Sequence, residues 1–317
     1  MKILFISPRY SGGIGGHALR IAEKLRENGF DIELMHAPHI PIKKLKNPTF
    51  VITSILKAIF NRKKYDVVHA FNMPSAFAMK YVNAKKRVLS VHGVYSEQIG
   101  LLHSSTTSSI VSQREHKILQ CADKLLTNSV NVQKTYKNKF GVDFDYIYGP
   151  VDIIKLKEIT SNVSKIERQI VYIGRDSFEK GIDILKKIES KINANVVYCT
   201  NLDWKKTMKI LKSSNLLIVP SRIDNIPNVI KEALYLKIPI VGTDIEGISE
   251  IITNDVNGIL VPPENTEKLI EAINDLLLHK EKAENLAEVG YEFVIKNLTW
   301  DVLLPKYKKF YEDLVNQ

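Results

Sequence analysis

The sequence predicts an α/β protein built from two doubly wound parallel sheets. Short apolar, β-branched runs alternate with helix-length segments along the chain, and these runs form two sets. A length of 317 residues, 44% of them apolar and 25% charged, suits two domains of ordinary size. Ligands bind outside the carboxyl ends of strands in such sheets, so we expect the two domains to face a central cleft.

The predicted strands are the apolar runs themselves. In the first half they cover residues 2–7, 31–37, 65–70, 87–92, 124–129 and 144–149. In the second half they cover residues 169–174, 195–200, 215–221, 238–244 and 258–263. Since one compact sheet does not hold both sets, we place a joint near Gly149 and Pro150. The predicted domains are residues 1–152 and 153–299, with an amphipathic helix over about 300–317, kinked or broken at Pro305, that packs back on the first domain.

The net charge of +10 is carried by the first half of the chain. Residues 1–152 hold 22 Lys and Arg against 11 Asp and Glu, and residues 34–96 hold eleven basic residues against the single acid Asp66. This excess indicates an anionic partner: phosphate groups, an anionic membrane surface or nucleic acid. No apolar run is long enough for a signal sequence or a membrane span, and Cys121 and Cys199 are far apart in sequence, so we expect a cytoplasmic protein.

A basic segment in the first half predicts a helix from about Pro48 to Asn61. Its apolar residues are assigned to the core, because a helix needs such residues to cover a sheet: Val51, Ile52, Ile55, Leu56 and Ile59. The flanking basic residues are assigned to the inner face of the cell membrane: Lys43, Lys44, Lys46, Arg62, Lys63 and Lys64. Nucleic acid is disfavoured as a partner, because no nucleic-acid-binding motif accompanies this segment.

A glycine-rich stretch follows the first predicted strand and precedes a helix predicted from His17 to about Asn28. Glycines let backbone N–H groups approach an anion, so the stretch predicts a phosphate site; a loop that binds nothing is the alternative. Residues 13–18 also fit the dinucleotide pattern G-x-G-x-x-A, with Glu33 as the ribose carboxylate. An NAD(P)-dependent oxidoreductase is therefore the competing function, although five residues separate the strand from Gly13.

Two further stretches carry groups suited to a nucleoside diphosphate. In "IVYIGRDSFEKG", Arg175 and Lys180 follow a strand, where two fixed cations can neutralise a leaving diphosphate. Either cation alone is better explained as an exposed loop residue, and the stretch that follows favours the diphosphate. In "PSRIDNIPNVIKEAL", Pro227 is predicted as the first residue of a helix, so that the N–H groups of Asn228 and Val229 can bind a phosphate.

The order of these stretches resembles the large family of retaining GT-B glycosyltransferases that use nucleotide-activated sugars, of the group 1 or family 4 type. The resemblance is carried by "GGIGG", "SVHG", "YIGRDSFEKG", "PSRIDNIPNVIKEA", "VGTDIEGISEII" and "NGILVPPENTEKL". It covers nearly the whole chain and is most specific over residues 170–263. It implies a GT-B fold of two Rossmann-like domains, the first on the acceptor side and the second binding the donor.

The resemblance also implies roles for single residues. Gly15 and Gly16 match the glycine loop near the donor phosphates, and His92 matches a histidine near the transferred sugar. Arg175 and Lys180 match the diphosphate-binding pair.

Two carboxylates complete the implied donor site. Asp224 matches the contact to the donor sugar, where the family usually has Glu, and Glu232 matches the contact to the ribose. Pro227 stands where the family has glycine, which removes one backbone donor. Gly149 and Pro150 replace the usual residues at the hinge, so the match is weaker there.

The reaction implied is transfer of a hexose to an acceptor hydroxyl with retention at the anomeric carbon, the leaving diphosphate serving as base. The acceptor expected is a lipid-linked or cell-surface glycan precursor, with association with the membrane left open. We expect no cofactor and no catalytic metal, although Asp143 and Asp145 spell the D-x-D of metal-dependent enzymes. A non-catalytic sugar-nucleotide-binding protein is the remaining alternative.

Overall fold

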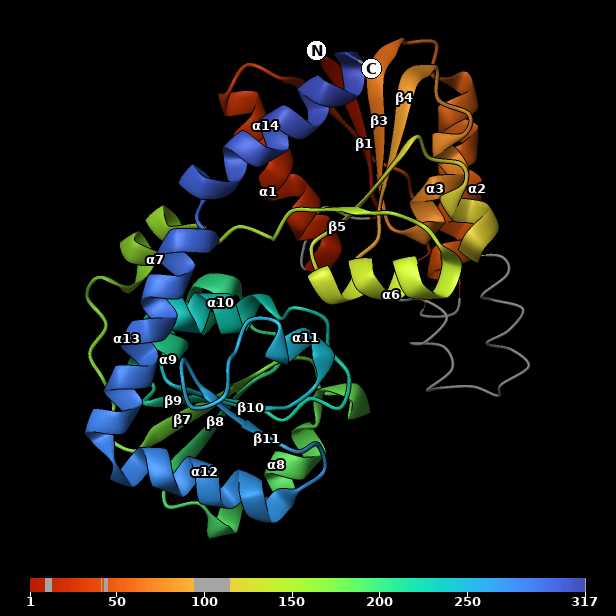
Figure 1. Cartoon of the computed structure of the whole chain (residues 1–317). Coiled ribbons are helices and arrows are strands. Elements are labelled where there is room, and N and C mark those ends of the chain that lie inside the picture. Colours follow the sequence, from red (N-terminus) through yellow and green to blue (C-terminus); the bar gives the residue numbers. More distant parts are fainter. Residues whose placement is uncertain (9–12, 41, 43–44, 94–114, 317) are drawn as a thin grey trace. The chain divides into compact units, whose positions relative to one another are not determined.

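The computed structural model describes residues 1–8, 13–40, 42, 45–93 and 115–316 (Figure 1). The chain divides into two compact units, which we call unit 1 and unit 2. Unit 1 comprises Met1–Tyr148 and Leu304–Gln317, and unit 2 comprises Gly149–Leu303. Each unit has a parallel sheet of its own.

The sheet of unit 1 has the strand order β2-β1-β3-β4-β5-β6, and every neighbouring pair is parallel. Its strands are β1 (Lys2–Ile6), β2 (Asp31–Met35), β3 (Tyr65–Phe71), β4 (Ala84–Ser90), β5 (Lys124–Thr127) and β6 (Asp145–Tyr146). The described helices of this unit are α1 (Gly13–Glu27), α2 (Lys46–Phe60), α3 (Met73–Met79), α6 (Val130–Phe140) and most of α14 (Trp300–Asn316).

The sheet of unit 2 has the order β11-β10-β9-β7-β8, again parallel throughout. Its strands are β7 (Gln169–Ile173), β8 (Asn195–Cys199), β9 (Leu216–Val219), β10 (Ile240–Thr243) and β11 (Ile259–Val261). The α-helices described here are α7 (Ile153–Thr160), α8 (Ile182–Ile188), α9 (Trp204–Ser213), α10 (Asn228–Tyr235), α11 (Glu246–Ser249), α12 (Thr266–Leu278) and α13 (Lys280–Asn297).

Local chemistry explains where several helices begin and end. The side chains of Asn72, Ser129, Asp203 and Asn265 accept hydrogen bonds from free N–H groups in the first turns of α3, α6, α9 and α12. Gly141 ends α6 in the left-handed conformation, with φ of 65°. The β-branched strands then bury their side chains against these helices, as in Ile170 and Leu217, which are fully buried.

Unit 1 carries a buried polar network that joins its sheet to its last helix. His69 on β3 contacts the Tyr311 hydroxyl of α14 through Nδ1 and Ser90 Oγ through Nε2, at 2.6 Å each. The imidazole also stacks on Phe71, with ring centroids 4.0 Å apart. Burial lowers the pKa of His69 well below its usual value, so the ring is neutral and satisfied by these two hydroxyls.

Some predicted helix boundaries were wrong. Helix α1 begins at Gly13 rather than His17, so Gly15 and Gly16 lie in its first turn. Helix α10 begins at Asn228, and Pro227 is its N-cap with φ of −66° and ψ of 128°. The predicted break at Pro305 is absent, because Pro305 lies inside α14, which runs on to Asn316; the kink stays a prediction.

The assignment of helix α2 to the core was also wrong for three of the five residues. Ile52, Leu56 and Ile59 are 59%, 50% and 52% exposed. The face turned inward carries Phe50, Ser54 and Ala58, each fully buried, because α2 packs closely against α3, whose buried residues include Ser75, Ala76 and Ala78. The lysines at 43 and 44 lie outside the described residues.

Candidate functional site

The predicted donor-binding residues of unit 2 gather at the carboxyl ends of neighbouring parallel strands. Arg175 and Lys180 follow β7, Asp224 follows β9, and Glu232 lies on α10, which leads from β9 to β10. Strands β7, β9 and β10 are adjacent in the sheet, so the loops after them lie at one edge. Topology thus brings together residues that are more than 40 positions apart in the sequence.

Lys180 and Asp224 form an ion pair that sequence reasoning did not foresee. The Lys180 Nζ to Asp224 Oδ2 distance is 2.5 Å, and the two side chains are only 20% and 12% exposed. Burial raises the pKa of the Asp224 carboxyl, while the Lys180 ammonium acts in the opposite direction and favours the charged form. The pair holds the ammonium at a fixed place beside the sheet edge.

Two glycines allow the loops around this pair to pack backbone against backbone. Gly181 has φ of +66°, and a Cβ there would overlap the carbonyl oxygen of Pro220. A Cβ at Gly247, on α11 after β10, would overlap the backbone of Asp224 and Asn225. Both glycines are therefore required by close approach, and Gly247 supports the loop that carries the aspartate.

Arg222 braces the two loops, and its role was missed from the sequence. Its guanidinium binds both carboxylate oxygens of Asp183 at 2.7 Å and donates to the carbonyl of Phe178 at 2.7 Å. It also pairs with Glu264 and lies 3.8 Å from the centre of the Phe178 ring. The bidentate pairing with Asp183 raises the pKa of Arg222 and lowers that of Asp183. The available signal was that Arg222 is a basic residue two positions before Asp224, within a stretch already identified.

Arg175 differs from the other cations of this region. Its side chain is exposed and makes no salt bridge with any residue in the described part of the chain. Its carbonyl accepts a hydrogen bond of 2.8 Å from the Tyr172 hydroxyl, which fixes the turn after β7. Nearby, Ser177 Oγ is buried without a hydrogen-bond partner among the described residues. Arg175 is thus free to receive an anion.

Helix α10 presents the other donor-side groups. Asn228 and Val229 are its first two residues, where an α-helix leaves N–H groups without an intrahelical acceptor. Further along, the Glu232 carboxylate accepts a hydrogen bond of 2.9 Å from the Trp204 indole at the start of α9. Trp204 was not singled out from the sequence, although an aromatic residue directly after Asp203, the cap of α9, was visible there.

The residues predicted for unit 1 also come together. Gly15 and Gly16 are buried in the first turn of α1, after β1, and His92 follows β4. The next residue of α1, His17, packs edge to face on His92, with ring centroids 5.2 Å apart. Both imidazoles are mostly buried, at 7% and 8% exposure. Gly12, part of the predicted glycine stretch, lies outside the described residues.

The dinucleotide interpretation of residues 13–18 loses its acidic partner. Glu33 lies in the middle of β2 rather than at its carboxyl end. It accepts a hydrogen bond of 2.7 Å from the Tyr65 hydroxyl and pairs with Lys63 at 2.9 Å and Lys2 at 3.2 Å. These contacts, led by Tyr65, lower the pKa of Glu33 to about 2. The carboxylate is therefore engaged within the fold.

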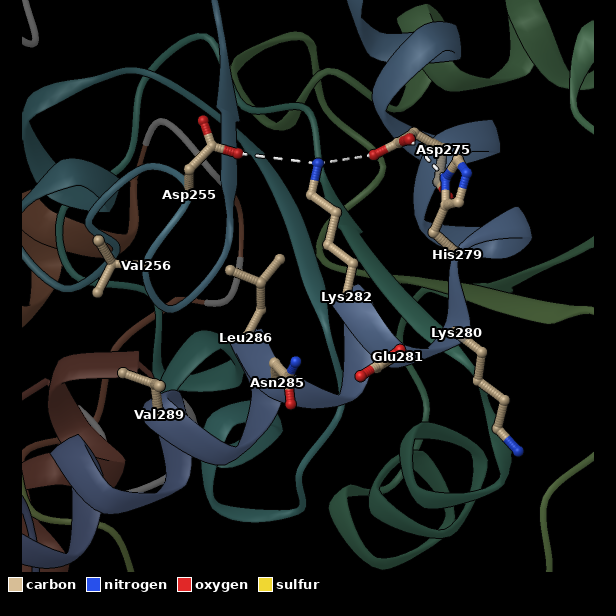
Figure 2. A pocket seen from close by; sticks show the side chains of 10 residues that line it. All are labelled: Asp255, Val256, Asp275, His279, Lys280, Glu281, Lys282, Asn285, Leu286 and Val289. Atoms are coloured by element: carbon tan, nitrogen blue, oxygen red, sulfur yellow. Dashed lines mark hydrogen bonds and ion pairs between the residues drawn. The ribbon is translucent and has the colours of Figure 1, made fainter.

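Two further groups of charged residues form ion pairs among themselves. Of the D-x-D tripeptide, Asp143 pairs with Lys137 and Asp145 with Lys124. Unit 2 has a pocket of about 810 Å³. In Figure 2, Lys282 of this pocket lies between Asp275 and Asp255, and its ammonium is 2.8 Å from the first carboxylate and 3.9 Å from the second. His279 also contacts Asp275. None of the predicted site residues lines this pocket, and its charges compensate one another.

Two family models match the chain. The model for glycosyl transferases group 1 matches residues 186–293, and the model for Glycosyltransferase Family 4 matches residues 11–155. The first match contains Asp224 and Glu232, and the second contains Gly15, Gly16 and His92.

Known proteins resemble the chain over nearly its full length. An uncharacterized glycosyltransferase of Methanocaldococcus jannaschii is 22% identical, over 95% of each chain. A sucrose-phosphate synthase from Thermosynechococcus elongatus has a similar structure, with a TM-score of 0.79 at 17% identity over 99% of each chain. The Anabaena protein HepE, solved with UDP and glucose, has a TM-score of 0.75 at 17% identity over 99% of this chain and 100% of its own. The fold is thus the two-domain Rossmann-like GT-B fold.

Proposed function

Because the chain belongs to the group 1 glycosyltransferases, enzymes that transfer a sugar from a nucleotide-sugar donor, we propose that it moves a hexose to an acceptor hydroxyl with retention at the anomeric carbon. The observation that carries this proposal is the cation site of unit 2, where Arg175 is exposed and Lys180 is held by Asp224. Two cations at the carboxyl ends of parallel strands suit the diphosphate of such a donor.

Each group of the cation site has a proposed role. Arg175 and Lys180 bind the diphosphate and stabilise the charge that develops on it as the glycosidic bond breaks. The N–H groups of Asn228 and Val229 bind the phosphate next to them. Asp224 orients Lys180 and, by its position, accepts a hydrogen bond from the donor sugar.

Glu232 is proposed to bind the ribose. Its carboxylate accepts from the Trp204 indole, and a carboxylate has several lone-pair sites, so it can accept from a ribose hydroxyl as well. HepE, whose structure contains UDP and glucose, supports a nucleoside diphosphate in this kind of fold. The identity of the base is left to experiment.

On unit 1, we assign His92 to the transferred sugar and Gly15 and Gly16 to the donor phosphates. Gly15 and Gly16 lie in the first turn of α1, where an α-helix leaves N–H groups without an intrahelical acceptor and the absence of side chains favours close approach of an anion. The leaving diphosphate is proposed to accept the acceptor's proton, so that no protein carboxylate acts as nucleophile. Because two cations neutralise the leaving group, we propose that turnover needs neither a cofactor nor a divalent metal.

The acceptor is proposed to be a lipid-linked or cell-surface glycan precursor. The basic excess of the first half supports it, because anionic lipid attracts such a surface. No helix of the described residues is long and apolar enough to span a membrane. Association would therefore be peripheral, on the inner face of the cell membrane.

The proposal is tested by thermal shift with UDP-, GDP-, ADP- and dTDP-sugars and with NAD, all in EDTA, followed by an assay of donor hydrolysis and sugar transfer. Stabilisation by one nucleotide series, with turnover in EDTA, is the expected result. Stabilisation by NAD alone would support the oxidoreductase instead. Donor binding with no hydrolysis or transfer to any acceptor would support a non-catalytic sugar-nucleotide-binding protein.

A further inference from the structure

Helix α2 carries large apolar side chains on the face that points away from its own core. Leu45, Ile52, Leu56, Ile59 and Phe60 are 45%, 59%, 50%, 52% and 78% exposed, and we call them the α2 surface. Consecutive members of this set are seven, four, three and one residues apart in the sequence, and this spacing places them on one side of a helix. The opposite side is fully buried at Phe50, Ser54 and Ala58. Single exposed apolar residues are ordinary, but four large ones on successive turns of one helix face, from Ile52 to Phe60, mark an interaction surface.

Basic residues border this row. Lys57 lies on α2 and is exposed, and its ammonium also donates to the carbonyl of His36. Arg62 and Lys64 follow the helix directly and are exposed. The acids nearby are already engaged, because Glu33 is paired with Lys63 and Asp66 with Lys85. The border of the α2 surface is therefore net positive.

A cavity of about 580 Å³ opens beside the row, between α2 and β2. Leu56 and Phe60 contribute apolar lining, Lys57 contributes a cation, and Lys63 and Glu33 line the cavity as an ion pair. An apolar lining beside the net positive border formed by Lys57, Arg62 and Lys64 matches an amphiphile that has an anionic headgroup. A second protein surface would need acidic partners and a complementary shape, whereas a lipid surface supplies negative charge and adaptable apolar contact together.

We propose that the α2 surface docks on an anionic lipid bilayer, with Ile52, Leu56, Ile59 and Phe60 entering the headgroup boundary and Lys57, Arg62 and Lys64 binding the lipid phosphates. The inference deepens the peripheral association proposed above, but it does not depend on sugar transfer. Helix α2 lies in the plane of the membrane in this arrangement, as amphipathic interfacial helices do. The enzyme then meets an acceptor that is itself held in the bilayer.

The test is sedimentation of the full chain with phosphatidylcholine vesicles that do or do not contain phosphatidylglycerol. We expect binding to the anionic vesicles only, weakened by salt. Replacing Ile52→Ser with Leu56→Ser should lower the affinity about tenfold or more, because two exposed apolar side chains no longer enter the bilayer. Replacing Arg62→Ser with Lys64→Ser should lower it by a comparable factor.

The matched control is the pair Ile154→Ser and Leu278→Ser in unit 2, where the residues are 72% and 78% exposed. This pair should leave vesicle binding unchanged. Equal vesicle binding by the α2 variant and the control would overturn the proposal, as would equal binding to vesicles without phosphatidylglycerol. Sedimentation velocity without lipid tests whether the α2 surface binds a second copy of the chain instead. A wild type that dimerises, together with an α2 variant that does not, would overturn the proposal.

The same variants separate this inference from the proposed enzyme function. Thermal shift with the nucleotide-sugar donor should be unchanged in the α2 variant, which also shows that the variant is folded. A wild type that binds vesicles but no donor would refute sugar transfer and leave the lipid surface standing. A wild type that binds and uses its donor but binds no vesicle would refute the lipid surface and leave sugar transfer standing.

Discussion

The cation site of unit 2 and the α2 surface of unit 1 use the same residue types in opposite ways. In unit 2, Lys180 is held by Asp224 and Arg222 by Asp183, so these two cations have fixed positions, while Arg175 beside them is exposed. Around α2, Arg62 and Lys64 are exposed and follow the end of a helix. A fixed geometry suits a single ligand such as a diphosphate, whereas loosely held cations around apolar side chains suit a fluid surface. Whether the fold pairs a basic side chain with a carboxylate or leaves it exposed therefore decides which kind of ligand it can bind.

The largest effect is expected from removing the cation of the buried pair. Lys180→Ala should lower turnover by about 10²–10³-fold, because the developing charge on the diphosphate loses a fixed donor. It should also destabilise unit 2 by about 1–3 kcal/mol, because Asp224 remains buried without its ammonium. Steady-state kinetics and urea unfolding measure the two effects.

Lys187→Ala is the control for this change, because Lys187 is exposed on α8. It should alter neither quantity. If Lys180→Ala behaves like Lys187→Ala, the cation site is no better organised than a surface lysine, and the contrast between the two regions fails.

A second change loosens the cation site without touching a charge. Gly247→Ala introduces a Cβ that overlaps the backbone of Asp224 and Asn225, so the loop must move. We expect a loss of about 1–3 kcal/mol of stability and about a tenfold fall in turnover. Ser249→Ala on the same helix, where the side chain is exposed, should do neither. Normal turnover in Gly247→Ala would mean that the position of Asp224 is unimportant.

A smaller effect is expected at the proposed ribose contact. Glu232→Gln keeps an oxygen for the Trp204 indole but removes the charge, so the donor KM should rise about tenfold while turnover changes little. Glu232→Ala should raise KM further. An unchanged KM in both variants would remove Glu232 from the donor site.

The smallest effect concerns the pH dependence of stability in unit 1, where a carboxylate rather than a cation is held by its partners. The pKa of Glu33 is lowered from 4.5 to about 2, so its contribution is fully present above about pH 4.5 and is lost as the pH falls toward 2. Glu33→Gln should therefore flatten the decline of the thermal midpoint over that range. Glu27→Gln, at an exposed pair with Lys24, should reproduce the wild-type curve. A wild-type slope in Glu33→Gln would show that this carboxylate does not stabilise the fold.

Most of the fold was predictable, because a strand buried on both faces leaves a continuous apolar run. All eleven predicted runs overlap a strand, from Lys2–Ile6 to Ile259–Val261, although β4 begins three residues before its run. Helix α2 was harder, because it is apolar on both sides and periodicity does not choose between them. Ser54 and Ala58 face inward since close packing on α3 needs small residues, and no sequence pattern announces such packing.

The residues of the candidate site were identifiable, but their contacts were not. Arg175, Lys180, Asp224 and Glu232 stand in recognisable motifs, yet the pairing of Lys180 with Asp224 depends on β7 and β9 being neighbours. The brace formed by Arg222 joins Asp183 and Glu264, which are 81 positions apart. Contacts of this kind follow from strand order, which the sequence alone left open. The roles of these residues remain predictions.

The most direct test of the central claim is calorimetric titration of UDP, and of the other nucleoside diphosphates, into the wild type and into Arg175→Ala in EDTA. The account predicts that one diphosphate binds the wild type without metal and that Arg175→Ala lowers its affinity about tenfold or more. The thermal midpoint should not change, because Arg175 is exposed and makes no salt bridge within the described residues. Equal affinity in both proteins would contradict the account, since the diphosphate would then bind elsewhere.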